Sequence, residues 1–259
     1  YIAKDKQTLD PEILDRLCTA LGHRGPDGEG RYVKGPVGFI QTRLAIIDLD
    51  TGDQPIYHEN GSALVANGEI YNYVELRKSL CEASFKTRSD SETALRVYAR
   101  DNIGGFDALR GMYAFAIHDA VENQVVLCRD PFGIKQLYYV ETPEYFAFAS
   151  EAQTLIAAGL VGRDVRSDAR SELLQVQFTT GSDMIFDGIK RLLPGETIVL
   201  SNGRIIDRRR RQVLGDSASV GTHLEAALTD WDRVFEESVR VHQRSDVDYA
   251  MFLSGGVDS

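Results

Sequence analysis

Five short segments of the chain are too polar and too rich in glycine to be ordinary core. Within them, Arg43 offers a planar fork of donors that suits a carboxylate, and Asp90 offers a counter-charge for an ammonium group. Taken singly, each segment also has a plain structural explanation, such as a helix cap or a tight turn. The segments are His23-Arg24-Gly25-Pro26-Asp27-Gly28, residues 43–49, Asn67-Gly68-Glu69-Ile70-Tyr71-Asn72, Ser89-Asp90-Ser91-Glu92 and residues 129–135.

A sixth segment, near the carboxyl end, has the composition of a phosphate-binding loop. The continuous apolar run 249–253 predicts a buried parallel strand. Ser254-Gly255-Gly256-Val257-Asp258-Ser259 follows it. Its glycines let backbone N–H groups approach an anion, and a helix beginning near Asp258 would point its positive end at that anion. The segment lacks the Gly-Lys-Ser/Thr ending of a Walker A loop. An ordinary strand-to-helix turn is the alternative.

In this order and spacing, the first five segments resemble the amino-terminal glutaminase domain of the asparagine synthetase family, a class II glutamine amidotransferase with an N-terminal nucleophile. The sixth looks like the pyrophosphate loop of N-type ATP pyrophosphatases, which lies in the synthetase domain of the same family. The resemblance implies an α+β fold, with an αββα sandwich of two antiparallel sheets followed by the beginning of an α/β ATP-pyrophosphatase domain. It implies a glutaminase domain over 1–206, a linker over 207–221 and the start of the synthetase domain over 222–259.

The resemblance also implies a glutamine pocket. Arg43 would hold the α-carboxylate of glutamine, while Asp90 and Glu69 would accept from its ammonium group. The side-chain N–H of Asn67 and the backbone N–H of Gly68 would form the oxyanion hole. Glycine at 68 is expected because a Cβ would stand between the backbone and the substrate. The expected pocket residues are Arg43, Leu44, Ala45, Ile46, Ile47, Asn67, Gly68, Glu69 and Asp90.

The nucleophile of the family is a cysteine whose own α-amine is the base, and we expect it a few residues before Tyr1. Cys18 falls on a predicted helix, Cys81 at the end of one and Cys128 in a hairpin strand, so all three are expected to be structural thiols. The alternative is a degenerate glutaminase domain in an ATP-dependent cyclase that resembles the β-lactam synthetases. The retained glutamine-binding residues favour a working amidotransferase.

For the whole protein, the resemblance implies that ammonia released from glutamine passes through an internal channel to a carboxylate activated by ATP and Mg²⁺. Aspartate is the expected acceptor, and acids of secondary metabolism are the alternative. A homodimer is expected because the family commonly forms one. The expected ATP-binding residues are Leu253, Ser254, Gly255, Gly256, Val257, Asp258 and Ser259.

Composition excludes several other classes of protein. The net charge of −10 argues against a basic nucleic-acid footprint, and no apolar run reaches the length of a membrane span. The odd number of cysteines, without CxxC spacing, argues against a disulfide framework and a zinc site. The histidines lack metal-ligand spacing. We therefore expect a cytoplasmic protein with small-molecule substrates and no nucleic-acid or membrane partner.

Hydrophobic periodicity and turn signals predict the elements that must position these residues. Asn72 is expected to cap the second helix, with Glu75 as its capping-box partner. Helices are predicted over 10–22, 72–82, 90–103 and 224–241. Strands are predicted over 37–40 and 44–47, and hairpins over 112–129, 137–149 and 197–206.

Overall fold

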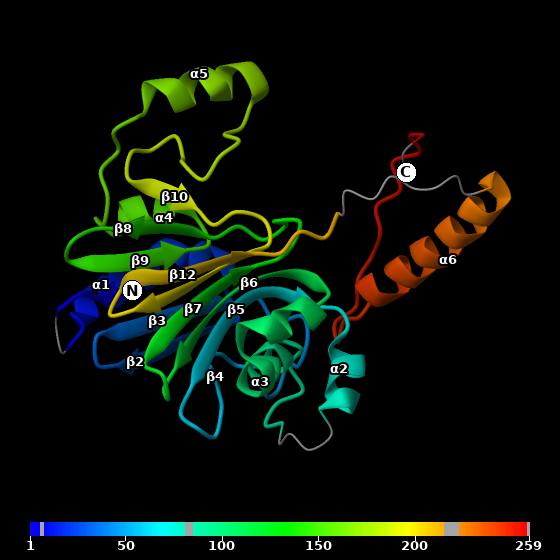
Figure 1. Cartoon of the computed structure of the whole chain (residues 1–259), viewed down its shortest axis with the longest axis horizontal. Coiled ribbons are helices and arrows are strands. Elements are labelled where there is room, and N and C mark those ends of the chain that lie inside the picture. The colour runs from blue at the N-terminus through cyan, green and yellow to red at the C-terminus, as the bar shows by residue number, and fades with distance from the viewer. Residues whose placement is uncertain (6–7, 81–84, 215–222, 258–259) are drawn as a thin grey trace.

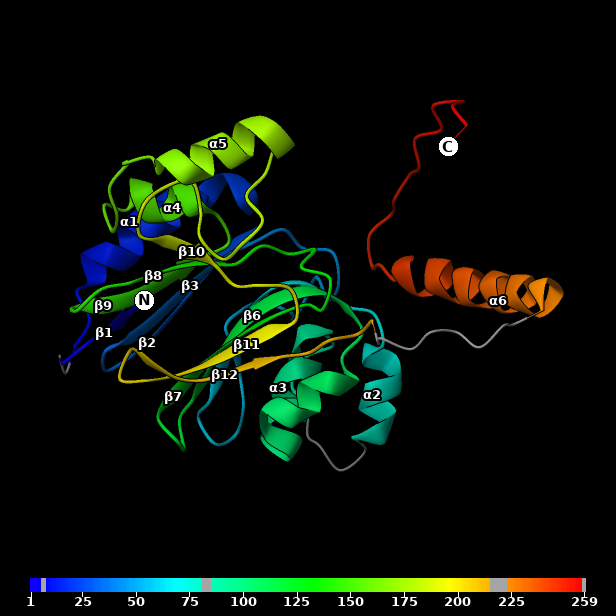
Figure 2. The same cartoon turned by 45° about the horizontal axis from the view of Figure 1, so that its top comes forward.

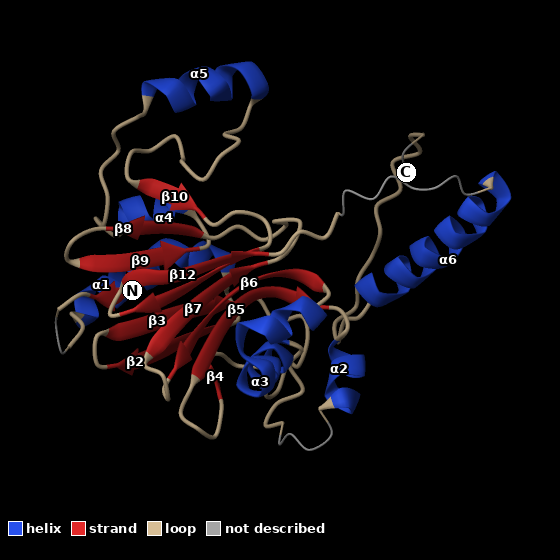
Figure 3. Ribbon diagram, viewed as in Figure 1, coloured by secondary structure: helices blue, strands red, loops and turns tan. Residues whose placement is uncertain are grey.

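The computed structural model describes residues 1–5, 8–80, 85–214 and 223–257. Two six-stranded antiparallel sheets face each other, and helices cover the outer sides of both (Figures 1 and 3). This αββα sandwich is the fold that the sequence predicted. No helix in the described part of the chain is both long and apolar enough to cross a membrane.

The first sheet has the strand order β10-β8-β9-β1-β3-β2. Its central strand β1 is short, and Ile2 pairs with Val37 on one side and Phe146 on the other. The strands are β10 (Ile189–Arg191), β8 (Tyr138–Glu141), β9 (Tyr145–Ala149), β1 (Ile2–Ala3), β3 (Val37–Arg43) and β2 (Gly28–Lys34).

The second sheet has the order β12-β11-β7-β6-β5-β4. Within it, β6 pairs antiparallel with β5 and with β7, and α2, α3 and η2 lie in the connection between β5 and β6. The strands are β12 (Arg204–Arg210), β11 (Glu196–Ser201), β7 (Gln124–Arg129), β6 (Gly111–Asp119), β5 (Ala63–Ile70) and β4 (Ile56–Tyr57).

Helices close the two outer faces (Figure 2). On the first sheet lie α1 (Pro11–Leu21), which Asp10 caps by accepting from the amide of Glu12 at 3.0 Å, and α4 (Ala152–Ala157). On the second lie α2 (Tyr73–Ser79), α3 (Ser91–Asp101) and the 3-10 helix η2 (Asn102–Ala108). The 3-10 helix η1 (Gly22–Arg24), α5 (Ser167–Val176) and α6 (Leu224–His242) complete the elements.

The main core lies between the sheets. Phe39 and Phe146 of the first sheet are fully buried with Leu127 and Ala116 of the second. The bulky rings come mainly from one sheet and small alanines from the other, so the inner faces interdigitate. This packing brings the carboxyl ends of β3 and β5 to one side of the sandwich, where the expected glutamine residues lie.

Three expectations about elements are wrong. Residues 44–47 are a loop because their backbone groups bond to side chains rather than to a strand: Asp27 accepts from Ala45, and Arg43 donates to Ile47. The boundary expected at 206/207 falls inside β12, which continues through Arg210. Residues 249–253 are exposed coil and do not form the expected buried strand. Among the described residues, no strand pairs with them.

Asn72 and Glu75 do not form the expected capping box. The Asn72 side chain accepts from Arg110 N at 2.9 Å and donates to Ala108 O at 2.9 Å, so it ties α2 to η2. Glu75 instead binds Arg244, from the segment after α6. Tertiary partners have replaced the local ones.

A buried ion pair holds the loop that leads to Asp90. The carboxylate of Glu92, fully buried, accepts from Thr87 N at 2.7 Å, Lys86 N at 2.9 Å and Arg96 Nη2 at 2.9 Å. Burial alone would raise the pKa of Glu92, but these hydrogen bonds outweigh it and lower the pKa. The ionised carboxylate therefore organises residues 86–90.

Replacing Glu92 with glutamine is expected to lower the free energy of unfolding by about 3 kcal/mol, because buried Arg96 and two amides lose their charged acceptor. Glu59→Gln is the matched control: Glu59 also binds Arg96, but its side chain is 45% exposed, and about 1 kcal/mol is expected. Urea unfolding measures both variants. Equal losses would contradict the role given to Glu92.

Candidate functional site

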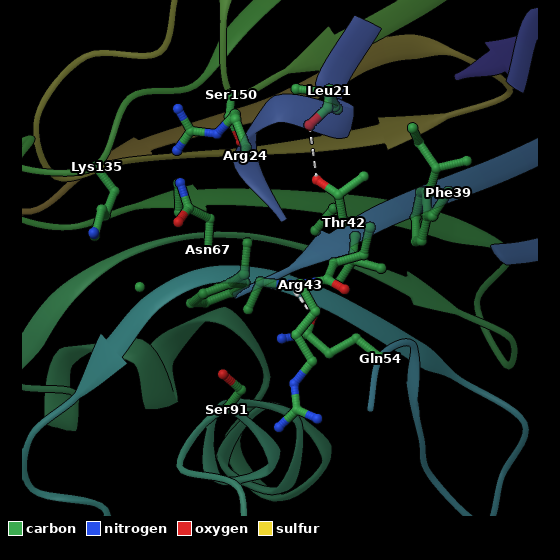
Figure 4. A pocket seen from close by; sticks show the side chains of 18 of the residues that line it. Leu21, Arg24, Phe39, Thr42, Arg43, Gln54, Asn67, Ser91, Lys135 and Ser150 are labelled. Carbon is green, nitrogen blue, oxygen red and sulfur yellow. Dashed lines mark hydrogen bonds between the residues drawn. The ribbon is translucent and has the colours of Figure 1, made fainter. Parts of the chain in front are cut away.

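A cavity of about 290 Å³ lies between the two sheets. Its walls come from the carboxyl ends of β3 and β5, from α1 and from the loops after β3 and before α3 (Figure 4). The inner part is apolar, with Leu14, Phe39 and Phe148, whereas the outer part carries charged and amide side chains. The size and this division are typical of a pocket for a small polar ligand.

Asn67 stands at the centre of the polar part. Figure 4 shows its side chain rising from β5 into the pocket, with Lys135 to one side and Arg24 and Ser150 above it. Among the described residues, no protein group forms a hydrogen bond with its amide. The amide is thus available to a ligand.

Gly68 lines the same pocket, and the packing of the neighbouring strand requires glycine there. A Cβ at this position would lie 2.0 Å from Met112 O and 2.7 Å from Tyr113 Cα. The backbone φ of +138° also disfavours any L side chain. The neighbouring strand β6 therefore excludes a side chain here.

Arg43 is buried at the other end of the pocket. Its Nη1 donates to Asp53 at 2.8 Å, and its Nη2 donates to Asp48 O at 2.5 Å and Ile47 O at 3.2 Å. Figure 4 shows the guanidinium turned toward Ser91, away from Asn67. The side chain of Asp53 is 85% exposed, so the partner of this guanidinium is a carboxylate that reaches it from the surface.

The loop after Arg43 lines the pocket with Leu44, Ile46 and Ile47, as expected, but not with Ala45. The amide of Ala45 donates to Asp27 Oδ2 at 2.9 Å. Ala45 is therefore bound to Asp27 through its backbone, and its role in the pocket stays a prediction.

Asp90 and Glu69 bring two carboxylates to the pocket. Asp90 is 4% exposed, and its Oδ2 accepts from Ile70 N at 2.6 Å. Burial raises the pKa of Asp90 to about 6, although the amides of Ile70 and Ser91 oppose the shift. Burial also raises the pKa of Glu69, although the positive charge of Lys135 opposes this shift. A cationic ligand between these groups would relieve both shifts.

Lys135 and Arg24 line the pocket although no role was expected for them. The turn before Lys135 is shaped by buried Asp130, which accepts from the amides of Ile134 at 3.0 Å and Lys135 at 2.9 Å. Arg24 binds Glu151 at 2.6 Å. Both residues belong to segments whose polarity marked them in the sequence, but spacing alone does not show which side chain turns inward.

The two described thiols lie outside the pocket. Burial raises the pKa of Cys18 to about 11 and that of Cys128 to about 12. Both are therefore protonated and poorly nucleophilic near neutral pH, in agreement with the prediction of structural thiols. Cys81 lies outside the described residues.

The expected ATP-binding residues are only partly described. Leu253 and Val257 are exposed, and the Ser254 hydroxyl accepts from Gly256 N at 3.2 Å. Gly255 adopts a φ of +76°, a conformation that glycine allows readily. Asp258 and Ser259 lie outside the described residues. In the described ranges, no group of three or more His, Cys, Asp or Glu side chains could hold a metal ion.

Known proteins of two kinds resemble the chain in sequence. Glutamine-hydrolysing asparagine synthetases 1 and 2 of Bacillus subtilis are each 35% identical, over 98% and 95% of this chain. Amidase chry2 of Gibberella zeae is 31% identical over 96% of it. The chain covers 40%, 35% and 38% of these relatives, so it spans about two fifths of their length.

Solved structures share the fold. Glutamine phosphoribosylpyrophosphate amidotransferase from B. subtilis, complexed with ADP and GMP, has a TM-score of 0.59 and 19% identity over 81% of this chain and 48% of its own. The structure of the allosteric regulatory enzyme of purine biosynthesis gives the same values. These neighbours support the sandwich and nothing more specific.

Two family models match successive parts of the chain. Residues 230–259 match the family described as asparagine synthase. Residues 2–210 match the family described as a glutamine amidotransferase domain, and this match covers most of the chain. The chain therefore belongs to the glutamine amidotransferase domain family.

Proposed function

We propose that the protein containing this chain is a glutamine-dependent amidotransferase of the asparagine synthetase type. The observation that carries the proposal is one pocket that combines the free amide of Asn67, the buried carboxylate of Asp90 and the guanidinium of Arg43. These groups suit the amide, ammonium and carboxylate of glutamine, respectively. The similarity to asparagine synthetases over nearly the whole chain supports the same assignment.

In the proposed reaction, a cysteine thiolate attacks the side-chain carbonyl of glutamine, and Asn67 and Gly68 donate to the resulting oxyanion. Expulsion of ammonia leaves a γ-glutamyl thioester, which water hydrolyses to glutamate. We propose that this cysteine precedes Tyr1. Tyr1 lines the pocket and pairs with Gly38 through two backbone hydrogen bonds of 2.8 Å, so a residue before it would be close to the cavity.

The ammonia would then amidate an adenylated carboxylate, most simply that of aspartate, with release of AMP. In this proposal the backbone amides of residues 253–257, together with Asp258 and Ser259, hold ATP phosphates. The composition of the loop fits an anion, since Gly255 and Gly256 carry no side chain to block its approach. No described residue is assigned to Mg²⁺, whose ligands would have to come from elsewhere.

We propose an amidotransferase domain that extends through Arg210, a linker after it, and a synthetase domain that includes α6. The stripe of Leu228, Trp231 and Phe235 on α6 is exposed, as expected for a helix that packs within a larger α/β domain. We further propose that the protein works in the cytoplasm, as a homodimer, in asparagine biosynthesis.

The test uses the full-length protein with glutamine labelled with ¹⁵N in its side-chain amide, together with ATP and aspartate. We expect glutamate, AMP, pyrophosphate and asparagine that carries the label. Pyrophosphate release without glutamine hydrolysis would contradict the proposal and would favour a degenerate domain in a cyclase-like ligase. Glutamine hydrolysis without labelled asparagine would contradict aspartate as the acceptor.

Replacing Arg43 with lysine is expected to raise the KM for glutamine by about 10- to 100-fold, because an ammonium group cannot reproduce a bidentate fork. Steady-state glutamate release measures the change. Arg31→Lys is the matched control, since Arg31 lies on β2 in surface ion pairs and outside the pocket. An unchanged KM in Arg43→Lys would remove Arg43 from the binding site.

A further inference from the structure

The segment that follows α6 lies against both chain segments that border the glutamine pocket. Figures 1 and 2 show the end of α6 beside α2. From there the chain passes over residues 71–75, which follow β5, and over residues 46–48, which follow β3. It therefore contacts the amidotransferase sandwich where substrate would bind, although it lies more than 30 residues beyond β12.

Arg244 makes the first contact. Its guanidinium donates to both carboxylate oxygens of Glu75, at 2.9 and 2.7 Å, and also to Tyr71 O. The pairing lowers the pKa of Glu75 to about 2, so the ion pair persists over the whole physiological range. The His242 ring packs on Tyr71 with 4.1 Å between ring centroids. This contact fixes the chain immediately after β5.

Asp246 makes the second contact. Its Oδ2 accepts from Asp48 N at 2.7 Å, and its own amide donates to Ile46 O at 3.0 Å. The backbone of residues 46–48 is thus bound from outside by Asp246 and from inside by Arg43, which donates to Ile47 O and Asp48 O. Ile46 and Ile47 line the pocket between these two groups.

We propose that Arg244 and Asp246 are positioning residues for the glutamine pocket, supplied by the part of the chain that carries the ATP-binding loop. The inference rests on the proposed glutamine hydrolysis. Asp246 holds the loop that carries the Arg43 contacts, and Arg244 holds the strand end that carries Asn67 and Glu69. Neither residue lines the pocket itself. The two contacts tie the geometry of the glutamine pocket to a segment that ends eight residues before Ser254.

The test compares Asp246→Ala with Asp246→Asn in the full-length protein. The alanine variant loses the acceptor for Asp48 N, and we expect the KM for glutamine to rise about fivefold with kcat within twofold. Asparagine keeps an amide oxygen that can accept the same hydrogen bond, so it should restore the KM. The double variant Arg244→Ala/Asp246→Ala should raise the KM by more than tenfold.

Glu237→Gln is the matched control. Glu237 lies on α6 and binds Arg110 at 2.6 Å, with both side chains about 45% exposed, and neither residue reaches the pocket. Its KM for glutamine should equal that of the wild type. Ammonia-dependent amide synthesis, which bypasses the glutamine pocket, should be unchanged in every variant and shows that each one folds.

Hydrogen–deuterium exchange gives a readout without activity. The peptide containing Asp48 should exchange faster in Asp246→Ala but not in Asp246→Asn. Wild-type KM and exchange in Asp246→Ala would overturn the inference, as would an asparagine variant as impaired as the alanine one. Absence of glutamine hydrolysis in the wild type would instead count against the proposed function, so the two failures are distinguishable.

Discussion

Replacing Asp90 with asparagine is expected to stabilise the folded protein while it removes glutamine binding. Burial raises the pKa of Asp90 from 3.8 to about 6, so at neutral pH the pocket contains a poorly solvated carboxylate. A shift of this size corresponds to roughly 3 kcal/mol. Asparagine keeps an oxygen for the amide of Ile70 but carries no charge. The KM for glutamine should rise at least ~100-fold, since the counter-charge for its ammonium is lost.

The pH dependence of stability and of the glutamine KM tests whether the charge of Asp90 causes both effects. Because the pKa of Asp90 is higher in the folded than in the unfolded chain, its protonation favours folding at low pH, and this contribution is lost as pH rises from about 4 to about 6. The stability gain of Asp90→Asn over the wild type should therefore be present at pH 8 and vanish near pH 4. The glutamine KM of the wild type should rise as pH falls below about 6.

Urea unfolding at several pH values and glutamate release measure these two effects. Asp232→Asn, on the exposed face of α6, is the control for loss of one negative charge. Parallel stability profiles of the wild type and Asp90→Asn would contradict the assignment, as would an asparagine variant with normal glutamine affinity.

Replacing Asn67 with alanine should lower kcat for glutamine hydrolysis by ~10²–10³ while KM changes little, because an oxyanion-hole donor acts mainly in the transition state. The amide of Asn67 has no hydrogen-bond partner within the described residues, so its removal leaves no buried group unpaired. Loss of folding is therefore not expected to account for the change. Glutamate release under saturating glutamine measures the effect.

Asn67→Asp is the matched variant, because it keeps the shape of the side chain but replaces the donor with a negative charge. It should be at least as impaired as alanine, while ammonia-dependent synthesis continues in both. A normal kcat in Asn67→Ala would show that Asn67 does not stabilise the oxyanion.

Local patterns predicted most of the elements. The cap at Asp10 and the apolar stripe behind it are confirmed in α1, and the turn signals are confirmed in the hairpins β6–β7, β8–β9 and β11–β12. The helix and the turn of each hairpin form between residues close together in the chain, so local sequence signals are sufficient to predict them.

The sequence patterns gave wrong predictions where side chains from distant parts of the chain form hydrogen bonds with the backbone. Residues 44–47 have the composition of a strand, but Asp27, Arg43 and Asp246 occupy the hydrogen bonds that a neighbouring strand would need. Glu75 has capping-box spacing, but Arg244 binds it. Such partners come from segments far apart in the chain, and no local period encodes them.

The sequence by itself determined which residues are candidates for a glutamine pocket, because residue type decides charge, hydrogen-bonding capacity and backbone freedom. The resemblance of its motifs to the asparagine synthetase family implied the αββα fold. Only the tertiary structure decided which of those residues face one cavity, that β6 excludes a side chain at Gly68, and that burial raises the pKa of Asp90. These properties depend on distance and desolvation, which arise only when the two sheets close on each other.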